Sequence, residues 1–119
     1  MKCKALLITA LLSWPVLAQT SPSEIHQLFK ALEASGCEFN RNGTWYNGQK
    51  ASEHLHRKYD YLLKKGLVTS TESFIGLAAS ESSMSGRAYM VRCGKSAPVR
   101  SKAWFLGKLA ELRKAPGRR

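Results

Sequence analysis

"CEFNRNGTWY", residues 37–46, is the stretch that decides the fold. Two short runs of strand-forming character flank Asn42-Gly43. A type I′ hairpin turn prefers this dipeptide, because both of its central residues need a positive φ. With Thr44 the same residues also form a glycosylation sequon, but a glycine directly after the asparagine favours the turn. The sequence therefore predicts a β-hairpin that begins at Cys37.

A third strand is predicted in "RAYMVRC", residues 87–93. Tyr89, Val91 and Cys93 recur at every second position, so they share one face of a strand. In an exported chain, Cys37 and Cys93 are expected to form a disulfide, which would tie the first strand to the third. Two free thiols, or half of a metal site, are the alternatives.

Helices are predicted before, between and after these strands, because apolar residues recur there at helical spacing. The predicted N-caps are Ser21, Asn47, Thr69 (in a capping box with Glu72) and Ser101, and the predicted stops are Gly36 and Gly66. The predicted core stripes are Ile25, Leu28, Phe29 and Leu32; Ala51, Leu55, Tyr59 and Leu62; Phe74, Ile75 and Ala78; and Phe105, Leu106, Leu109 and Leu112. The sequence thus predicts an α+β fold: a small three-stranded antiparallel sheet with about four packed helices and one disulfide. A helical bundle with a vestigial hairpin is the alternative.

Residues 1–18 are predicted to be a signal peptide. Lys2 and Lys4 precede a short apolar core, which a proline interrupts, and Val16 and Ala18 fit a cleavage site after Ala18. An uncleaved membrane anchor is the alternative, although the apolar core is short for a membrane span. We therefore expect export to the periplasm with no transmembrane anchor after cleavage.

The remaining chain is long enough for one modest core. We expect residues 19–115 to form a single α+β domain and residues 116–119 to be a basic disordered tail. The formal net charge of the whole chain is +11. This charge favours anionic partners, and export argues against nucleic acid. The expected partners are an anionic envelope glycan, a lipid headgroup or a phosphorylated small molecule.

A serine-rich connection, Ser80–Arg87, precedes the third strand and is called the serine loop below. Its hydroxyls can donate and accept hydrogen bonds, and Arg87 can grip a carboxylate or phosphate with a planar fork. If the hairpin turn and the second helix converge on this loop, they form a cationic, hydroxyl-rich site. The predicted ligand-binding residues are Arg41, Asn42, His54, Lys58, Ser82, Ser83, Ser85 and Arg87. The alternative is a solvated turn, with Lys58 only laying its stem over the core.

The sequence gives little support for catalysis. It has no GxSxG or SxxK motif, and only His54 could activate a serine. No catalytic residue, cofactor or metal site is expected, since HExxH and CxxC motifs are also missing. We therefore expect a binding protein, and a serine-dependent hydrolase remains an alternative.

Another alternative comes from residues 85–89, "SGRAY", whose form SGxxY is similar to a motif of exported lysozyme inhibitors. The inhibitors that carry it are largely β-structured, whereas this chain is predicted to be mostly helical. Many lysozymes are strongly basic, so a basic inhibitor would meet repulsion rather than electrostatic steering.

Several stretches together resemble the YfeK-like family, small exported proteins of Gram-negative bacteria with no assigned function. The resemblance covers roughly Ile25 to Arg113. It rests on Arg41-Asn42-Gly43, Ala51, His54-Leu55, Lys58, Glu72, Phe74-Ile75, Ala79-Ser80, Ser82-Ser83, Ser85-Gly86 and Tyr89. The family often carries proline where this chain has Ala88. The resemblance implies an exported compartment and the fold, and it implies no function.

Overall fold

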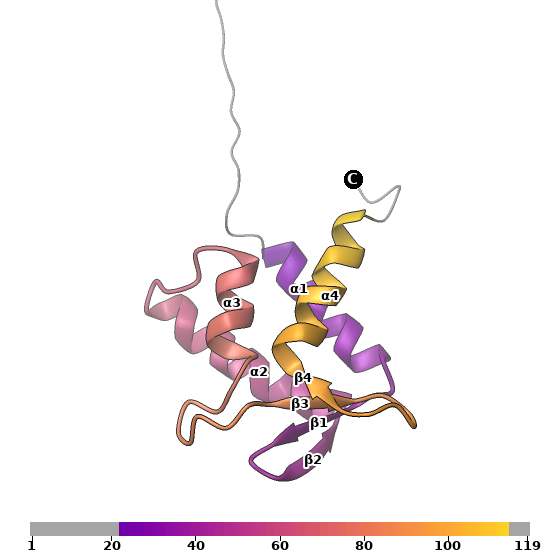
Figure 1. Ribbon diagram of the computed structural model, residues 1–119. Coiled ribbons are helices and arrows are strands. Elements are labelled where there is room, and N and C mark those ends of the chain that lie inside the picture. The colour runs from indigo at the N-terminus through magenta and orange to yellow at the C-terminus, as the bar shows by residue number, and fades with distance from the viewer. Residues whose placement is uncertain (1–21, 115–119) are drawn as a thin grey trace, which may run out of the picture.

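The structure is a computed structural model that describes residues 22–114. In chain order its elements are α1 (Pro22–Ala34), β1 (Glu38–Arg41), β2 (Thr44–Asn47), α2 (Gly48–Lys64), α3 (Thr71–Ala78), β3 (Met90–Arg92), β4 (Val99–Arg100) and α4 (Ser101–Lys114). The predicted signal peptide, 1–18, and the predicted basic tail, 116–119, lie outside the described residues. The helices gather on one side of the sheet (Figure 1).

The sheet has four antiparallel strands in the order β2-β1-β3-β4, so the predicted three-stranded sheet is wrong. The additional strand is β4, which pairs with β3 at Met90↔Arg100 and Val91↔Val99. Two residues are too few to show an alternating pattern, so the sequence does not mark this strand. The strand is therefore defined only by its tertiary pairing.

The predicted hairpin is confirmed. Asn42 has a φ of 52° and Gly43 a φ of 90°, which are the signs that a type I′ turn requires at both central positions. Phe39 of β1 lies opposite Val91 of β3, and both side chains are buried. This inner face of the sheet packs against the helices, and it fixes the position of the hairpin turn relative to α2.

The predicted core stripes of the first three helices are buried as expected. In α4 the structure buries Phe105 and Leu109, and Leu112 packs partly against the core. Leu106, however, is 37% exposed, so its place in the stripe was wrong. Trp104, which no pattern predicted, packs partly against the core instead.

The N-cap of α2 is as predicted, and the N-cap of α3 is shifted by one residue. Asn47 caps α2 as predicted, because its side chain accepts a hydrogen bond from the Lys50 N–H. The capping box of α3 is formed by Ser70 and Ser73, one residue later than the predicted pair of Thr69 and Glu72. Thr69 and Ser70 are both acceptable cap residues, so the sequence alone did not separate them.

Glu72 is instead held by the end of the last helix. Its carboxylate accepts a hydrogen bond from Arg113 Nη1 at 2.7 Å, and Arg113 Nε donates to Glu24 Oε2 at 2.7 Å. One guanidinium therefore joins α1, α3 and α4. These two hydrogen bonds raise the pKa of Arg113, and the bond to Arg113 lowers the pKa of Glu72.

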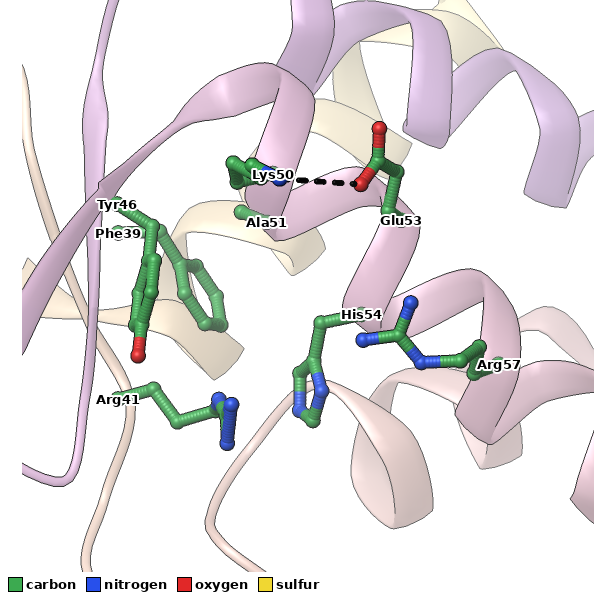
Figure 2. Close-up of a pocket in the computed structure, with 8 residues that line it drawn as sticks. All are labelled: Phe39, Arg41, Tyr46, Lys50, Ala51, Glu53, His54 and Arg57. Atoms are coloured by element: carbon green, nitrogen blue, oxygen red, sulfur yellow. Dashed lines mark ion pairs between the residues drawn. The ribbon is translucent and has the colours of Figure 1, made fainter.

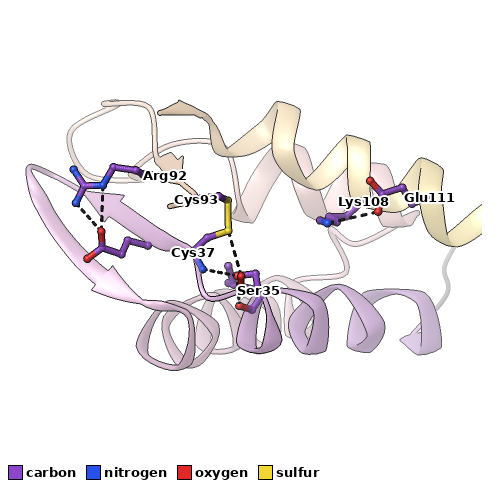
Figure 3. Close-up of a disulfide and its surroundings, with 8 residues drawn as sticks. Ser35, Cys37, Arg92, Cys93, Lys108 and Glu111 are labelled. Carbon is purple, nitrogen blue, oxygen red and sulfur yellow. Dashed lines mark hydrogen bonds and ion pairs between the residues drawn. A yellow bond between two sulfur atoms is a disulfide. The ribbon is translucent and has the colours of Figure 1, made fainter. Parts of the chain in front are cut away.

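The predicted disulfide between Cys37 and Cys93 is confirmed (Figure 3). It joins the residue before β1 to the residue after β3. The next pair across the same strands is an ion pair between Glu38 and Arg92 at 2.7 Å, and the Arg92 guanidinium lies 3.8 Å from the ring centre of Trp45. The far end of the hairpin carries the turn, and the disulfide anchors the near end.

Candidate functional site

The hairpin turn and the serine loop lie against each other, a condition of the predicted site that the sequence left open. Asn42 Nδ2 donates to Ser82 Oγ at 3.3 Å, and Ser85 Oγ donates to Asn42 Oδ1 at 2.6 Å. Ser82 is only 4% exposed, and its hydroxyl also accepts from the backbone N–H groups of Met84 and Ser85. These side chains are therefore used to shape the loop and to fasten it to the hairpin.

Arg87 also lies against the hairpin. A Cβ atom placed on Gly43 would lie 3.8 Å from Arg87 Nη1, so the guanidinium sits beside the turn. The backbone around it is fixed by hydrogen bonds from Ser82 N–H to the Arg87 carbonyl at 2.9 Å and from Arg87 N–H to Ser85 Oγ at 3.2 Å. Arg87 thus closes the serine loop over the hairpin turn.

The second helix reaches the base of the serine loop through Tyr89. This tyrosine is 1% exposed, and its hydroxyl lies 3.1 Å from His54 Nε2 and accepts a hydrogen bond from Lys58 Nζ at 3.1 Å. Lys58 Nζ also donates to the Glu81 carbonyl at 3.2 Å. The ammonium of Lys58 is therefore bound to the loop, so the side chain does more than cover the core.

A pocket of about 280 Å³ lies between the hairpin and α2. It is called the polar pocket below and is lined by Phe39, Arg41, Tyr46, Lys50, Ala51, Glu53, His54 and Arg57. Figure 2 shows the guanidinium groups of Arg41 and Arg57 approaching His54 from opposite sides. Lys50 and Glu53 form a long ion pair of 4.0 Å at its edge. Basic groups from β1 and α2 therefore share one small space.

These basic groups act on the ionisation of their neighbours. Burial, followed by the charges of Arg41, Lys58 and Arg57, lowers the pKa of His54 from 6.5 to about 4. Burial and the charge of Arg41 also lower the pKa of Lys58, while Glu81 opposes them. At neutral pH His54 is uncharged, because burial and, second, repulsion by the surrounding positive charges lower its pKa. An anion in the pocket would relieve this repulsion.

The pKa of His54 predicts a pH effect on stability. Between pH 6.5 and about 4 the unfolded chain binds a proton at His54 that the folded chain excludes, so stability should fall as the pH is lowered through this window. Below pH 4 both states are protonated and the contribution is constant.

The measurement is thermal unfolding of the wild type and of His54→Gln from pH 7 to pH 4. His26, His56 and the carboxylates remain in both proteins, so their effects cancel in the difference. The stability of the wild type relative to the variant should be greatest at pH 7 and decline toward pH 4. A difference that does not change with pH would contradict the prediction.

A second concavity of about 420 Å³ adjoins the polar pocket and shares His54 and Arg57 with it. It is called the apolar groove below and is lined by His54, Arg57, Lys58, Tyr61, Leu62, Leu77 and Ser83, from α2, α3 and the serine loop. Its surface is mostly apolar. His54 and Arg57 line both concavities, so the polar pocket and the apolar groove adjoin.

The eight predicted binding residues therefore divide into two groups. Arg41 and His54 line the polar pocket, and His54, Lys58 and Ser83 line the apolar groove. The other four line neither concavity and hold the serine loop on the hairpin; they are Asn42, Ser82, Ser85 and Arg87.

Sequence reasoning missed Tyr46, Lys50 and Arg57 in the polar pocket. A signal was available for the last two. Lys50, His54 and Arg57 follow the spacing i, i+4, i+7, which places them on one face of a helix. Arg57 is not among the predicted binding residues, because nothing in the sequence shows that the hairpin lies against this side of α2.

The arrangement offers little to a nucleophilic mechanism. The hydrogen bond of His54 goes to Tyr89, and within residues 22–114 no serine is hydrogen-bonded to this histidine. In the same part of the chain, no three His, Cys, Asp or Glu side chains are placed to share a metal ion. The SGxxY stretch ends in the buried Tyr89, whose hydroxyl is taken up inside the molecule rather than offered to another protein.

In a comparison with known protein families, residues 19–113 match the model of a family of unknown function (DUF5329). No curated protein and no solved structure matches the chain. None of the helices described in residues 22–114 has the length and apolar character needed to cross a membrane.

Proposed function

The chain belongs to the DUF5329 family of unknown function, so its function must be argued from its own site, and we propose that it is a non-catalytic binding protein for an anionic ligand. The ligand carries a phosphate or carboxylate group that enters the polar pocket. Arg41, Arg57 and Lys50 are the side chains that receive it.

The observation that carries this proposal is the unbalanced charge of the polar pocket. Three cationic side chains and a histidine line it against one carboxylate, Glu53, whose nearest charged partner is Lys50. Among the described residues, neither Arg41 nor Arg57 has a carboxylate partner within ion-pair distance. Two guanidinium groups beside a half-buried histidine repel one another, and a bound anion would remove that cost.

The geometry suits a small molecule with a charged end. A guanidinium presents parallel N–H groups that match two oxygens of a phosphate or carboxylate. Phe39 and Tyr46 supply aromatic surface next to these donors. An apolar wall with a few fixed polar groups is the usual composition of a small-molecule site.

The proposal includes export to the periplasm, as the N-terminal sequence predicts and the YfeK-like resemblance implies. The Cys37–Cys93 disulfide supports it, because structural disulfides form and persist in oxidising compartments. In that compartment the expected ligands are envelope glycans with anionic groups, lipid headgroups and phosphorylated small molecules.

The test is calorimetric titration with glucose 1-phosphate and with inorganic phosphate. Arg41→Ala should weaken binding by about tenfold to a hundredfold, because it removes a charge-assisted contact of about 1.5–3 kcal/mol. Arg41→Lys, which keeps the charge and loses the planar fork, should fall between the wild type and Arg41→Ala. Binding should also weaken with added salt, because partly exposed charges are screened.

Arg100→Ala is the matched control. Arg100 is an exposed arginine on β4, and it lines neither concavity. The control removes the same formal charge, so it should leave the affinity nearly unchanged. Equal losses of affinity in Arg41→Ala and Arg100→Ala would mean that only the net charge of the protein matters, and the proposal would then be wrong.

A further inference from the structure

The apolar groove has no role in the binding of a small anion. It is larger than the polar pocket, at about 420 Å³ against about 280 Å³. Its apolar walls are contributed by Tyr61, Leu62 and Leu77, from two different helices. A concavity of this size falls within the range of about 300–1,000 Å³ that small-molecule sites occupy.

The apolar surface of the groove is accessible. Tyr61 is 60% exposed and Leu77 is 48% exposed, whereas Leu62 beneath them is 8% exposed. Ser83 lines the groove from the serine loop, and the next residue, Met84, is 95% exposed. Apolar surface that stays in water does not stabilise the fold, and concave surfaces of this kind commonly mark binding sites.

The charged end of the groove is fixed by its neighbours. Arg57 and His54 form the boundary with the polar pocket, and Lys58 is held at the groove by its hydrogen bonds to Tyr89 and Glu81. A molecule that fits both spaces must therefore be apolar along one part and negatively charged at the other.

We propose that the polar pocket and the apolar groove bind one ligand together, a single-chain anionic amphiphile whose charged head lies between Arg41 and Arg57 and whose chain lies over Leu77 and Tyr61. This rests on the proposed function and names the class of ligand. A small phosphate would leave the groove empty, and a neutral lipid would leave the cations of the pocket unpaired.

The experiment is calorimetric titration with three probes: decyl phosphate below its micellar concentration, inorganic phosphate, and decyl maltoside as a neutral amphiphile with the same chain. Decyl phosphate should bind at least tenfold more tightly than inorganic phosphate. A tenfold gain corresponds to about 1.4 kcal/mol, which burial of about two methylene groups supplies. Decyl maltoside should bind more weakly than decyl phosphate, because it has no charge for the arginines.

The decisive variant is Tyr61→Gln/Leu77→Gln. It should lower the affinity for decyl phosphate by about tenfold and leave the affinity for inorganic phosphate unchanged. The matched control is Leu63→Gln/Leu67→Gln, in which two leucines that are 44% and 48% exposed and lie outside the groove are changed in the same way. All four side chains are substantially exposed, so both variants are expected to fold.

Each outcome separates the two proposals. If decyl phosphate and inorganic phosphate bind equally, or if the groove variant behaves like its control, the amphiphile is wrong while the anion site stands. If decyl phosphate depends on the groove but Arg41→Ala leaves its affinity unchanged, the groove is an apolar site without the anion contact and the amphiphile proposal is wrong, while the anion site is decided by the effect of Arg41→Ala on inorganic phosphate. Binding of decyl maltoside as tight as that of decyl phosphate would have the same meaning.

Discussion

Replacement of both Cys37 and Cys93 by alanine should lower the free energy of unfolding by about 2–5 kcal/mol. The two residues are 56 positions apart and joined in the structure, and loop-closure entropy for a loop of that length corresponds to about 4 kcal/mol. A domain of this size has a total stability of about 5–15 kcal/mol. The disulfide therefore supplies a large fraction of what holds the protein folded.

The measurement is denaturant unfolding of the wild type and the double variant, each with and without dithiothreitol. The reductant should destabilise the wild type to the level of the variant and leave the variant unchanged. Because both cysteines lie at the end of the hairpin away from the turn, the loss should act through the unfolded chain rather than through the pocket. Equal stability of the wild type and the variant in oxidising buffer would contradict the prediction.

The helices could be predicted because their signals are local. An apolar stripe at helical spacing, a cap residue before it and a glycine after it lie within one segment of the chain, and α1, α2 and α3 bury the expected residues. Leu106 fails for a tertiary reason. It lies at the border of the α4 stripe, and only the position of the neighbouring elements decides that Trp104 is partly covered while Leu106 stays exposed.

The hairpin and the disulfide could also be predicted, because Asn42-Gly43 specifies its own turn, and because the expected removal of residues 1–18 would leave two cysteines, which favours pairing if the chain is exported. The strand Val99–Arg100 could not, since two residues carry no periodic pattern. The same limit explains the cap of α3. Ser70 and Thr69 are both suitable cap residues. The hydrogen bond from Arg113 to Glu72 involves α4, which lies far from α3 in the sequence.

The candidate site was only partly predictable, because its residues come from segments that are separate in the sequence and meet only in the folded chain. The residues were selected for their chemistry, and the sequence left open whether the hairpin, α2 and the serine loop meet, as they do in the structure. The roles differ within that set. Asn42 donates a hydrogen bond to Ser82, and neither residue lines the polar pocket or the apolar groove, so in the structure both hold the serine loop on the hairpin. Arg57 was not predicted to bind, yet it borders both concavities because the hairpin and the serine loop flank α2.

The helix that carries the site depends on one glycine. Gly48 is the first residue of α2 and is buried against the end of α1. A Cβ atom at this position would lie 2.4 Å from the Leu32 carbonyl oxygen and 3.4 Å from the Glu33 Cα. The carbonyl cannot easily move, because it accepts hydrogen bonds from the Ser35 N–H at 3.2 Å and from Ser35 Oγ at 2.8 Å.

Gly48→Ala should therefore lower the free energy of unfolding by about 3 kcal/mol, at the upper end of the usual cost of overpacking. Both contacts are with backbone, so no side chain can rotate away to relieve them. Any relief requires α2 to move relative to α1. Since α2 carries Lys50, His54 and Arg57, the affinity for glucose 1-phosphate should fall together with the stability.

Gly107→Ala is the control, and it should change stability in the opposite direction. Gly107 lies in the middle of α4, and a Cβ atom there would meet nothing within 4 Å. Alanine is preferred over glycine inside a helix by about 0.5–1 kcal/mol, so this variant should be more stable than the wild type. Thermal unfolding of the two single variants compares the same chemical change at both positions. If Gly48→Ala is as stable as Gly107→Ala, the close approach of α1 and α2 does not constrain the fold, and the position of the pocket residues must be set by the sheet alone.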